Sequence, residues 1–134
     1  MHGFDVNWLA VLAATVAKFV LGGLWYSPLM FGPRWAAIVG GPQEEFKARM
    51  PRAIAIDVAG GFVMAWVLAN VLHFTGAVGL IPGVRVAFFL WLGFMAPPLL
   101  TTTVFEGRSM ALFAITNGYW LISLLIMGGL IGAL

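Results

Sequence analysis

Four long apolar segments constrain this chain more than any other feature of its sequence. They cover residues 6–27, 52–74, 84–104 and 109–134. A helix needs about 20 mostly apolar residues to cross the hydrocarbon core of a bilayer, which is about 30 Å thick. Each segment is long enough, and none has the strict alternation of apolar and polar residues that is typical of a strand. The sequence therefore predicts four transmembrane helices.

The composition supports this prediction. Hydrophobic residues make up 62% of the 134 residues and charged residues 9%, whereas a soluble domain carries about 25% charged residues. A chain of this length is too short to hide so much apolar surface from water. No polar segment is long enough for a second domain. We therefore predict a single all-α integral membrane domain over residues 1–134, in contact with the lipid bilayer.

The connections between the segments predict how the helices are arranged. "TGAVGLIPG" and "FEGR" are short and rich in turn-forming residues, so the helices that they join should be antiparallel neighbours in an up-down-up-down bundle. The longer connection contains "PQEEFKARMP" at residues 42–51, which we expect to form a short helix. Phe46 and Met50 share one face of it and favour a position in the membrane interface. A solvated helix without lipid contact is the alternative.

Positive charges predict the orientation of the bundle, because cytoplasmic connections are enriched in Lys and Arg. Arg85 is the only cation near one side of the predicted spans. The cations near the other side are Arg34, Lys47, Arg49, Arg52 and Arg108. We therefore expect the first and third connections to be cytoplasmic and both termini to lie outside.

Two charged residues, Lys18 and Asp57, lie within the predicted spans. A cation at the centre of a membrane helix costs about 2.5–3.5 kcal/mol on insertion scales, so both charges should face protein or water. Gly22 follows Lys18 by one turn, and Gly61 and Ala65 follow Asp57 along one stripe. These small residues allow another helix to approach closely. A direct Lys18–Asp57 ion pair and a water-bridged one are both open. A depth gap of about 6 Å, estimated from the helical rise, weighs against the direct pair.

Several further polar groups fall at a similar depth. Pro97 and Pro98 lack the amide hydrogens that would bond to the carbonyls of Gly93 and Phe94, so we expect a kink. The side chains and freed carbonyls at this depth form a predicted polar layer of Lys18, Asp57, Pro97, Pro98, Thr101, Asn117 and Tyr119. Either these groups satisfy one another or they line a cavity open to the cytoplasm. The first alternative is favoured because buried polar groups usually pair.

Two smaller features complete the candidate residues. Glu106 and Arg108 in "FEGR" lie at the predicted cytoplasmic rim, where they should pair with each other or with Arg34. Gly128 and Gly132 have the GxxxG spacing that allows close helix packing. This packing serves either the bundle itself or a contact between subunits.

The sequence offers little for catalysis. It contains no cysteine, which excludes disulfides, thiolate metal sites and thiol catalysis. We find no Ser-His-Asp set, no pattern of metal-ligand spacing and no phosphate-binding glycine loop. We therefore predict no catalytic residues, no metal and no cofactor. A net charge of +2 is too small and scattered to indicate a nucleic-acid partner.

Four stretches carry a resemblance: "NWLAV", "LGGLWYSPLMFG", "FEGRSMALF" and "NGYWLISLLIMGGLIGAL". With them the chain resembles, over nearly its whole length, a family of small, mostly bacterial membrane proteins catalogued only as a domain of unknown function. The resemblance implies four spans and a place in the bacterial inner membrane, and it leaves the activity open.

Three hypotheses for function follow. The first is a structural or accessory subunit that forms a homo-oligomer or docks on a larger membrane complex, favoured by the small-residue stripes and the small soluble portion. The second is a small-solute or ion transporter or channel that uses the polar layer. The third is a lipid-acting enzyme at the rim of Glu106 and Arg108, which lacks a nucleophile or metal site.

Overall fold

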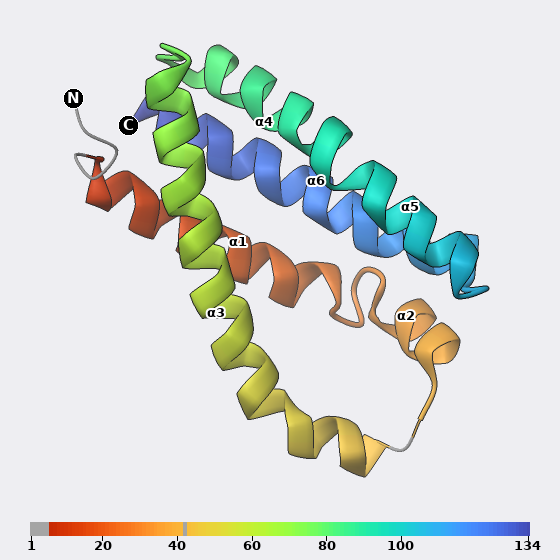
Figure 1. Ribbon diagram of the computed structural model, residues 1–134. Coiled ribbons are helices and arrows are strands. Elements are labelled where there is room, and N and C mark those ends of the chain that lie inside the picture. The colour runs from red at the N-terminus through yellow and green to blue at the C-terminus, as the bar shows by residue number, and fades with distance from the viewer. Residues whose placement is uncertain (1–5, 42) are drawn as a thin grey trace.

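The chain forms helices joined by turns and loops, and no strands, in the residues that the computed structural model describes, 6–41 and 43–134 (Figure 1). Four of the helical segments are long and apolar enough to cross a membrane: α1, α3, α4 together with α5, and α6. This confirms the predicted four-span, all-α architecture. The helices are α1 (Trp8–Trp25), α2 (Gly32–Val39), α3 (Gln43–Phe74), α4 (Leu80–Phe94), α5 (Ala96–Phe105) and α6 (Met110–Ala133).

Consecutive spans run in opposite directions, and both described ends of the chain meet at one end of the bundle. There the Asn7 side-chain amide donates to the carbonyl of Leu134 over 3.2 Å. The amide of Gly79, in the turn between α3 and α4, donates to the carbonyl of Gly132 over 2.8 Å. We call this the terminal end. The opposite end, which carries α2 and the turn between α5 and α6, is the loop end (Figure 1).

The core of the bundle lies around α6, which packs against α1, α3 and α4. Its side chains are small or medium apolar residues, including Val11, Ala14, Leu68 and Met127. Ala65 on α3 is also completely buried. The small residues among them, Ala14 and Ala65, let the helix backbones approach one another closely, as expected when lipid removes the hydrophobic drive for association.

The contact between α4 and α6 is made by backbone. A Cβ atom on Gly128 would lie 2.5 Å from the carbonyl oxygen of Gly83, and a Cβ on Gly132 would overlap the carbonyl oxygen of Gly79. Gly79 and Gly83 have the same i, i+4 spacing as Gly128 and Gly132. The predicted GxxxG pair thus packs within the bundle, against a second GxxxG pair that was not predicted.

The third span is interrupted where its two prolines enter. α4 ends at Phe94, Met95 leaves the helix, and α5 begins at Ala96 with Pro97 and Pro98 in its first turn. The amides of a first turn have no partner within their helix, so prolines cost little there. The predicted kink is confirmed as a break between two helices.

The region between the first two spans differs from the prediction in one respect. The segment expected to form a separate helix continues directly into the second span as part of α3, which has 32 residues and contains Pro51. Residue 42 lies outside the described part of the chain. The short helix of this region is instead α2, which has Pro33 in its first turn and ends before Gly40, where φ is +69°. Pro51 is exposed, so water or headgroups at this site are available to the carbonyl that it leaves unbonded.

The amino-terminal part of α3 stands away from the other spans (Figure 1). We call residues 43–56 the arm, because every described side chain from Glu44 to Ile56 is exposed. Trp35 on α2 bridges the arm to α1: its ring lies 5.7 Å from the Phe46 ring and 5.7 Å from the Tyr26 ring, between centroids. The arm and α1 therefore form a V that the aromatic bridge closes at the loop end.

Candidate functional site

A buried lysine lies where α1 and α3 cross. Only 2% of the Lys18 side chain is exposed, and its Nζ donates to Asp57 Oδ1 over 2.9 Å. Nζ also donates to the Tyr119 hydroxyl over 3.2 Å and lies 4.9 Å from the centroid of the Trp120 ring. A carboxylate, a hydroxyl and an aromatic face therefore replace the water that this cation loses.

The direct ion pair forms although the estimated depth gap weighed against it. The gap holds only if the spans have similar tilt and the second span begins at Arg52. In the structure α3 begins at Gln43 and crosses α1 at an angle (Figure 1). Depth counted in residues along α3 therefore does not equal depth along α1, and Asp57 lies at the level of Lys18. The angle at which α1 and α3 cross, and not only the length of the lysine side chain, brings Lys18 and Asp57 into contact.

Glycines make room for this cluster. A Cβ on Gly61 would lie 3.2 Å from Lys18 Cδ, and a Cβ on Gly22 would lie 2.9 Å from the Tyr119 hydroxyl. The Tyr119 hydroxyl in turn donates to the backbone carbonyl of Lys18 over 3.4 Å. The small residues predicted to allow helix packing thus allow the polar groups of three helices to meet.

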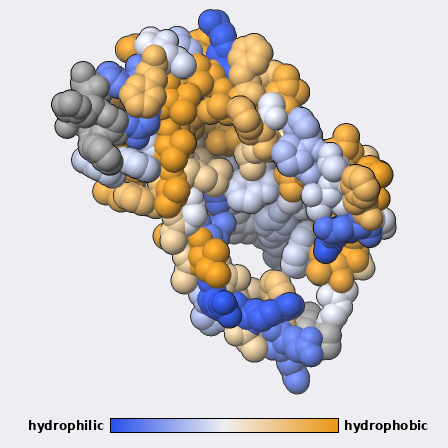
Figure 2. Space-filling model, viewed as in Figure 1, coloured by the Kyte–Doolittle hydropathy of each residue, from blue (hydrophilic) through white to orange (hydrophobic). Residues whose placement is uncertain are grey.

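Asp57 connects the buried cluster to a crevice between α1 and the arm. In contrast to Lys18, 38% of its side chain is exposed. The crevice has a volume of about 400 Å³, and an opening beside the arm is visible in the lower part of Figure 2. We call it the Asp57 crevice; it is lined by Phe19, Gly22, Gly23, Tyr26, Phe46, Met50, Ala53, Ile54, Asp57 and Tyr119.

Tyr26 follows α1 at the loop end and contributes a neutral hydroxyl to the crevice. Burial raises the pKa of Tyr26 above its usual value, and the nearby Tyr119 and Asp57 add to this effect. The hydroxyl therefore keeps its proton at physiological pH.

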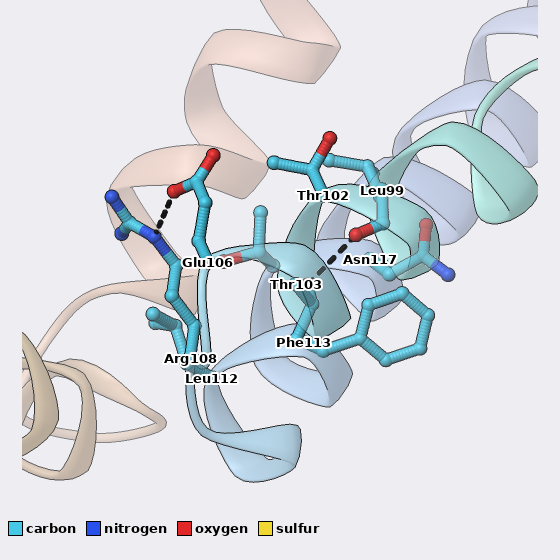
Figure 3. A pocket seen from close by; sticks show the side chains of 9 residues that line it. Leu99, Thr102, Thr103, Glu106, Arg108, Leu112, Phe113 and Asn117 are labelled. Carbon is cyan, nitrogen blue, oxygen red and sulfur yellow. Dashed lines mark hydrogen bonds and ion pairs between the residues drawn. The ribbon is translucent and has the colours of Figure 1, made fainter.

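A second crevice, of about 260 Å³, lies between α5 and α6 at the loop end (Figure 3). Arg108 Nε donates to Glu106 Oε1 over 2.7 Å, so the predicted rim residues pair with each other. Arg34 lies exposed on α2. The Thr103 hydroxyl donates to the carbonyl of Leu99 over 2.7 Å. The other side chains that line this Arg108 crevice are Thr102, Leu112, Phe113, Thr116 and Asn117.

The predicted polar layer is divided by α6. Tyr119 joins the Lys18 cluster, whereas Asn117 faces α4, where its Oδ1 accepts from Trp91 Nε1 over 3.0 Å. Residues two apart on a helix lie on nearly opposite faces. Pro97, Pro98 and Thr101 are exposed and line neither crevice. The structure thus brings together Lys18, Asp57 and Tyr119, and leaves the other members of the layer apart from them.

Trp91→Phe is expected to destabilise the fold by about 1–3 kcal/mol, because Asn117 would lose the donor to its buried oxygen. Trp8→Phe removes the same atoms at a position that is 46% exposed and should cost less than about 0.5 kcal/mol. Reversible unfolding of both variants in detergent micelles measures the difference. Equal losses would show that the Trp91–Asn117 hydrogen bond contributes nothing measurable.

Comparison with known proteins gives one match, to a family model. A family model described as "Protein of unknown function (DUF1761)" matches residues 9–132. The chain belongs to this family. The match extends over all four spans and confirms the resemblance inferred from the sequence motifs. No curated protein and no solved structure matches the chain.

Two of the sequence motifs of this DUF1761 member lie beside the two crevices. "LGGLWYSPLMFG" contains the end of α1 and the loop to α2, and "FEGR" forms the turn between α5 and α6. Both motifs lie at the loop end, and each supplies lining residues to one of the crevices, Gly22, Gly23 and Tyr26 to the first and Glu106 and Arg108 to the second. The loop end is therefore where the candidate sites gather.

The described residues contain no group of three His, Asp or Glu side chains close enough to hold a metal ion. What the Asp57 crevice offers instead is one carboxylate in an apolar surrounding. Sequence reasoning missed Trp91 and Trp120 as partners of the polar residues. The signal that would have found them is general: a tryptophan inside a span needs an acceptor for its N–H, and its face suits a cation.

Proposed function

We propose that the protein is a structural or accessory subunit of the bacterial inner membrane, which uses the arm to self-associate or to dock on a larger membrane complex. The observation that carries this proposal is the arm, which is the exposed amino-terminal part of the helix that forms the second span. Figure 2 shows hydrophilic residues gathered on it.

Length and charge support a location of the arm outside the hydrocarbon core. The 32 residues of α3 span about 48 Å at 1.5 Å per residue, which exceeds the roughly 30 Å of the core. Charged side chains are costly within that core. The charged residues of the arm are Glu44, Glu45, Lys47, Arg49 and Arg52. A charged helix outside the hydrocarbon core is a surface on which a protein partner can be selected by charge.

Site-specific cross-linking in native membranes tests the proposal, and the absence of cysteine makes it direct. Ala48→Cys, exposed on the arm, is labelled with a thiol-reactive benzophenone and irradiated. Val78→Cys, which is 82% exposed at the terminal end, is the matched control. We expect a discrete protein adduct from residue 48 alone, and its loss when Arg49 and Arg52 are both changed to Glu.

Mass spectrometry of the adduct distinguishes the two forms of the proposal. A second copy of the chain indicates self-association, and a different protein indicates a larger complex. Adducts of equal yield at residues 48 and 78, or lipid adducts alone at residue 48, would refute it.

The second candidate function is a transporter or channel for small solutes or ions. The observation that favours it is the partly exposed Asp57 with Lys18 buried behind it, a charge pair open to the crevice between α1 and the arm. Ion conductance across planar bilayers is the test. Conductance that disappears in the Lys18→Met/Asp57→Ala double variant supports transport, and an unchanged baseline in the unmodified protein argues against it.

A further inference from the structure

The Asp57 crevice contains one carboxylate, that of Asp57, among mostly apolar lining residues. Within the described part of the chain, Lys18 is the hydrogen-bond partner of Asp57 and uses its Oδ1. A carboxylate has about four acceptor sites on its two oxygens. Since 38% of the side chain is exposed, acceptor capacity remains on the side of the crevice. A ligand that fills this space must therefore donate a hydrogen bond to Asp57.

The charge of the cluster decides which donor fits. Lys18 and Asp57 together carry no net charge, and Lys18 lies directly behind the carboxylate. A cationic ligand at Asp57 would be repelled by Lys18, and an anionic ligand by Asp57 itself. An uncharged donor avoids both repulsions and loses less hydration when it enters an apolar space. A hydroxyl group meets these requirements.

The residues that line the crevice favour a ligand in which the hydroxyl group is attached to an apolar chain. Phe19, Met50 and Ile54 line the crevice together with Gly22 and Gly23. A Cβ placed on Gly23 would meet no atom within 4 Å, so the α1 wall is open at this point. The volume of about 400 Å³ lies in the range of small-molecule sites, about 300–1,000 Å³. Tyr26 and Phe46 line the crevice toward the loop end, and both rings contact the Trp35 ring.

We propose that the Asp57 crevice binds a lipid alcohol of the surrounding membrane, with its hydroxyl donating to Asp57 and its apolar chain between α1 and the arm. The Asp57 end of the crevice lies between α1 and the part of α3 that follows the arm, which belong to two segments long and apolar enough to cross a membrane, so the ligand enters from the lipid at this end. This inference goes beyond the docking of the arm, since it concerns the face of the arm that points toward α1.

The test uses the full chain in phosphatidylcholine vesicles and a long-chain alcohol with a photoreactive diazirine in its chain. The probe should label residues that line the crevice, and unlabelled hexadecanol should compete with it. The methyl ether of the photoreactive probe has no hydrogen to donate. It should label the crevice residues about tenfold less than the alcohol probe does, as expected for loss of a hydrogen bond to a charged group.

Matched glycine variants separate the crevice from the general lipid surface. Gly23→Leu fills the crevice and should abolish the labelling. Gly93→Leu places the same side chain on α4, where a Cβ also meets no atom within 4 Å, and should leave the labelling unchanged. Thermal unfolding of both variants verifies that they fold as the unmodified protein does.

A third variant tests the role of the carboxylate. The Lys18→Met/Asp57→Ala double variant removes the acceptor without leaving a charge unpaired, so it should bind alcohol and ether equally. Equal labelling by alcohol and ether in the unmodified protein would overturn the proposal. Labelling that persists in folded Gly23→Leu would overturn it as well. Neither result bears on cross-linking at residue 48, so the two proposals fail separately.

Discussion

Asp57→Asn is expected to destabilise the protein by about 3 kcal/mol. The substitution keeps the shape of the Asp57 side chain and leaves Lys18, whose side chain is only 2% exposed, without its counter-charge. Removing one partner of a buried ion pair costs about 3–5 kcal/mol. We expect the lower end because Asp57 is partly exposed and because Tyr119 and Trp120 still contact the ammonium. Equilibrium unfolding in mixed detergent micelles measures the loss.

The control is the double variant Lys18→Met/Asp57→Asn, which removes both charges. An apolar side chain of similar length replaces the lysine, so the double variant should lie within about 1 kcal/mol of the unmodified protein. The coupling between the two residues is the change in unfolding free energy of the double variant minus the sum of the changes in the single variants Lys18→Met and Asp57→Asn. A single Asp57→Asn variant as stable as the unmodified protein would show that Lys18 does not depend on Asp57 for its charge compensation.

The sequence predicted the spans because their signal is local. Length and apolar composition identify a membrane helix without knowledge of its neighbours, and the observed bounds of α1 and α6 lie within two residues of the predicted ones. Residues 43–51 of the arm were not predicted as part of α3, because Pro51 usually ends or kinks a helix. Here the site is exposed, so the lost hydrogen bond costs little and the helix continues.

The composition of the site was harder to predict than the spans. Residue numbers do not indicate which helix a side chain faces, and where spans cross at an angle they do not give its depth either. Lys18, Asp57 and Asn117 were all placed in one layer, yet α6 directs Asn117 to Trp91 and Tyr119 to Lys18. The crossing of α1 and α3 could not be derived from single helices either. Packing against α6, which is a property of the whole bundle, decides which polar groups meet.

The GxxxG pair shows the same limit in another form. Gly128 and Gly132 indicated that some helix packs closely against α6, and the spacing could not say which one. The partner carries its own pair, Gly79 and Gly83, within a segment whose glycines and proline predict only a turn. Matching the two pairs would have assigned α4 as the neighbour of α6.

Gly83→Ala is the prediction that tests this contact. A Cβ on Gly83 would overlap the carbonyl oxygen of Gly128, and a backbone atom within a helix cannot move aside as a side chain can. Overpacking costs about 1–3 kcal/mol, and the better helix propensity of alanine returns about 1 kcal/mol. We expect a net loss of about 2 kcal/mol in the free energy of unfolding, measured in micelles, because the clash is with backbone.

Gly93→Ala on the same helix is the matched control, and its effect should have the opposite sign. A Cβ there meets no atom within 4 Å, so only the gain in helix propensity, up to about 1 kcal/mol, remains. Combining Gly83→Ala with Gly128→Ala should cost less than the sum of the two, since both disturb one contact. If Gly83→Ala stabilised the protein as Gly93→Ala does, α4 and α6 would not meet through backbone, and the paired GxxxG motifs would lose their role in holding the bundle together.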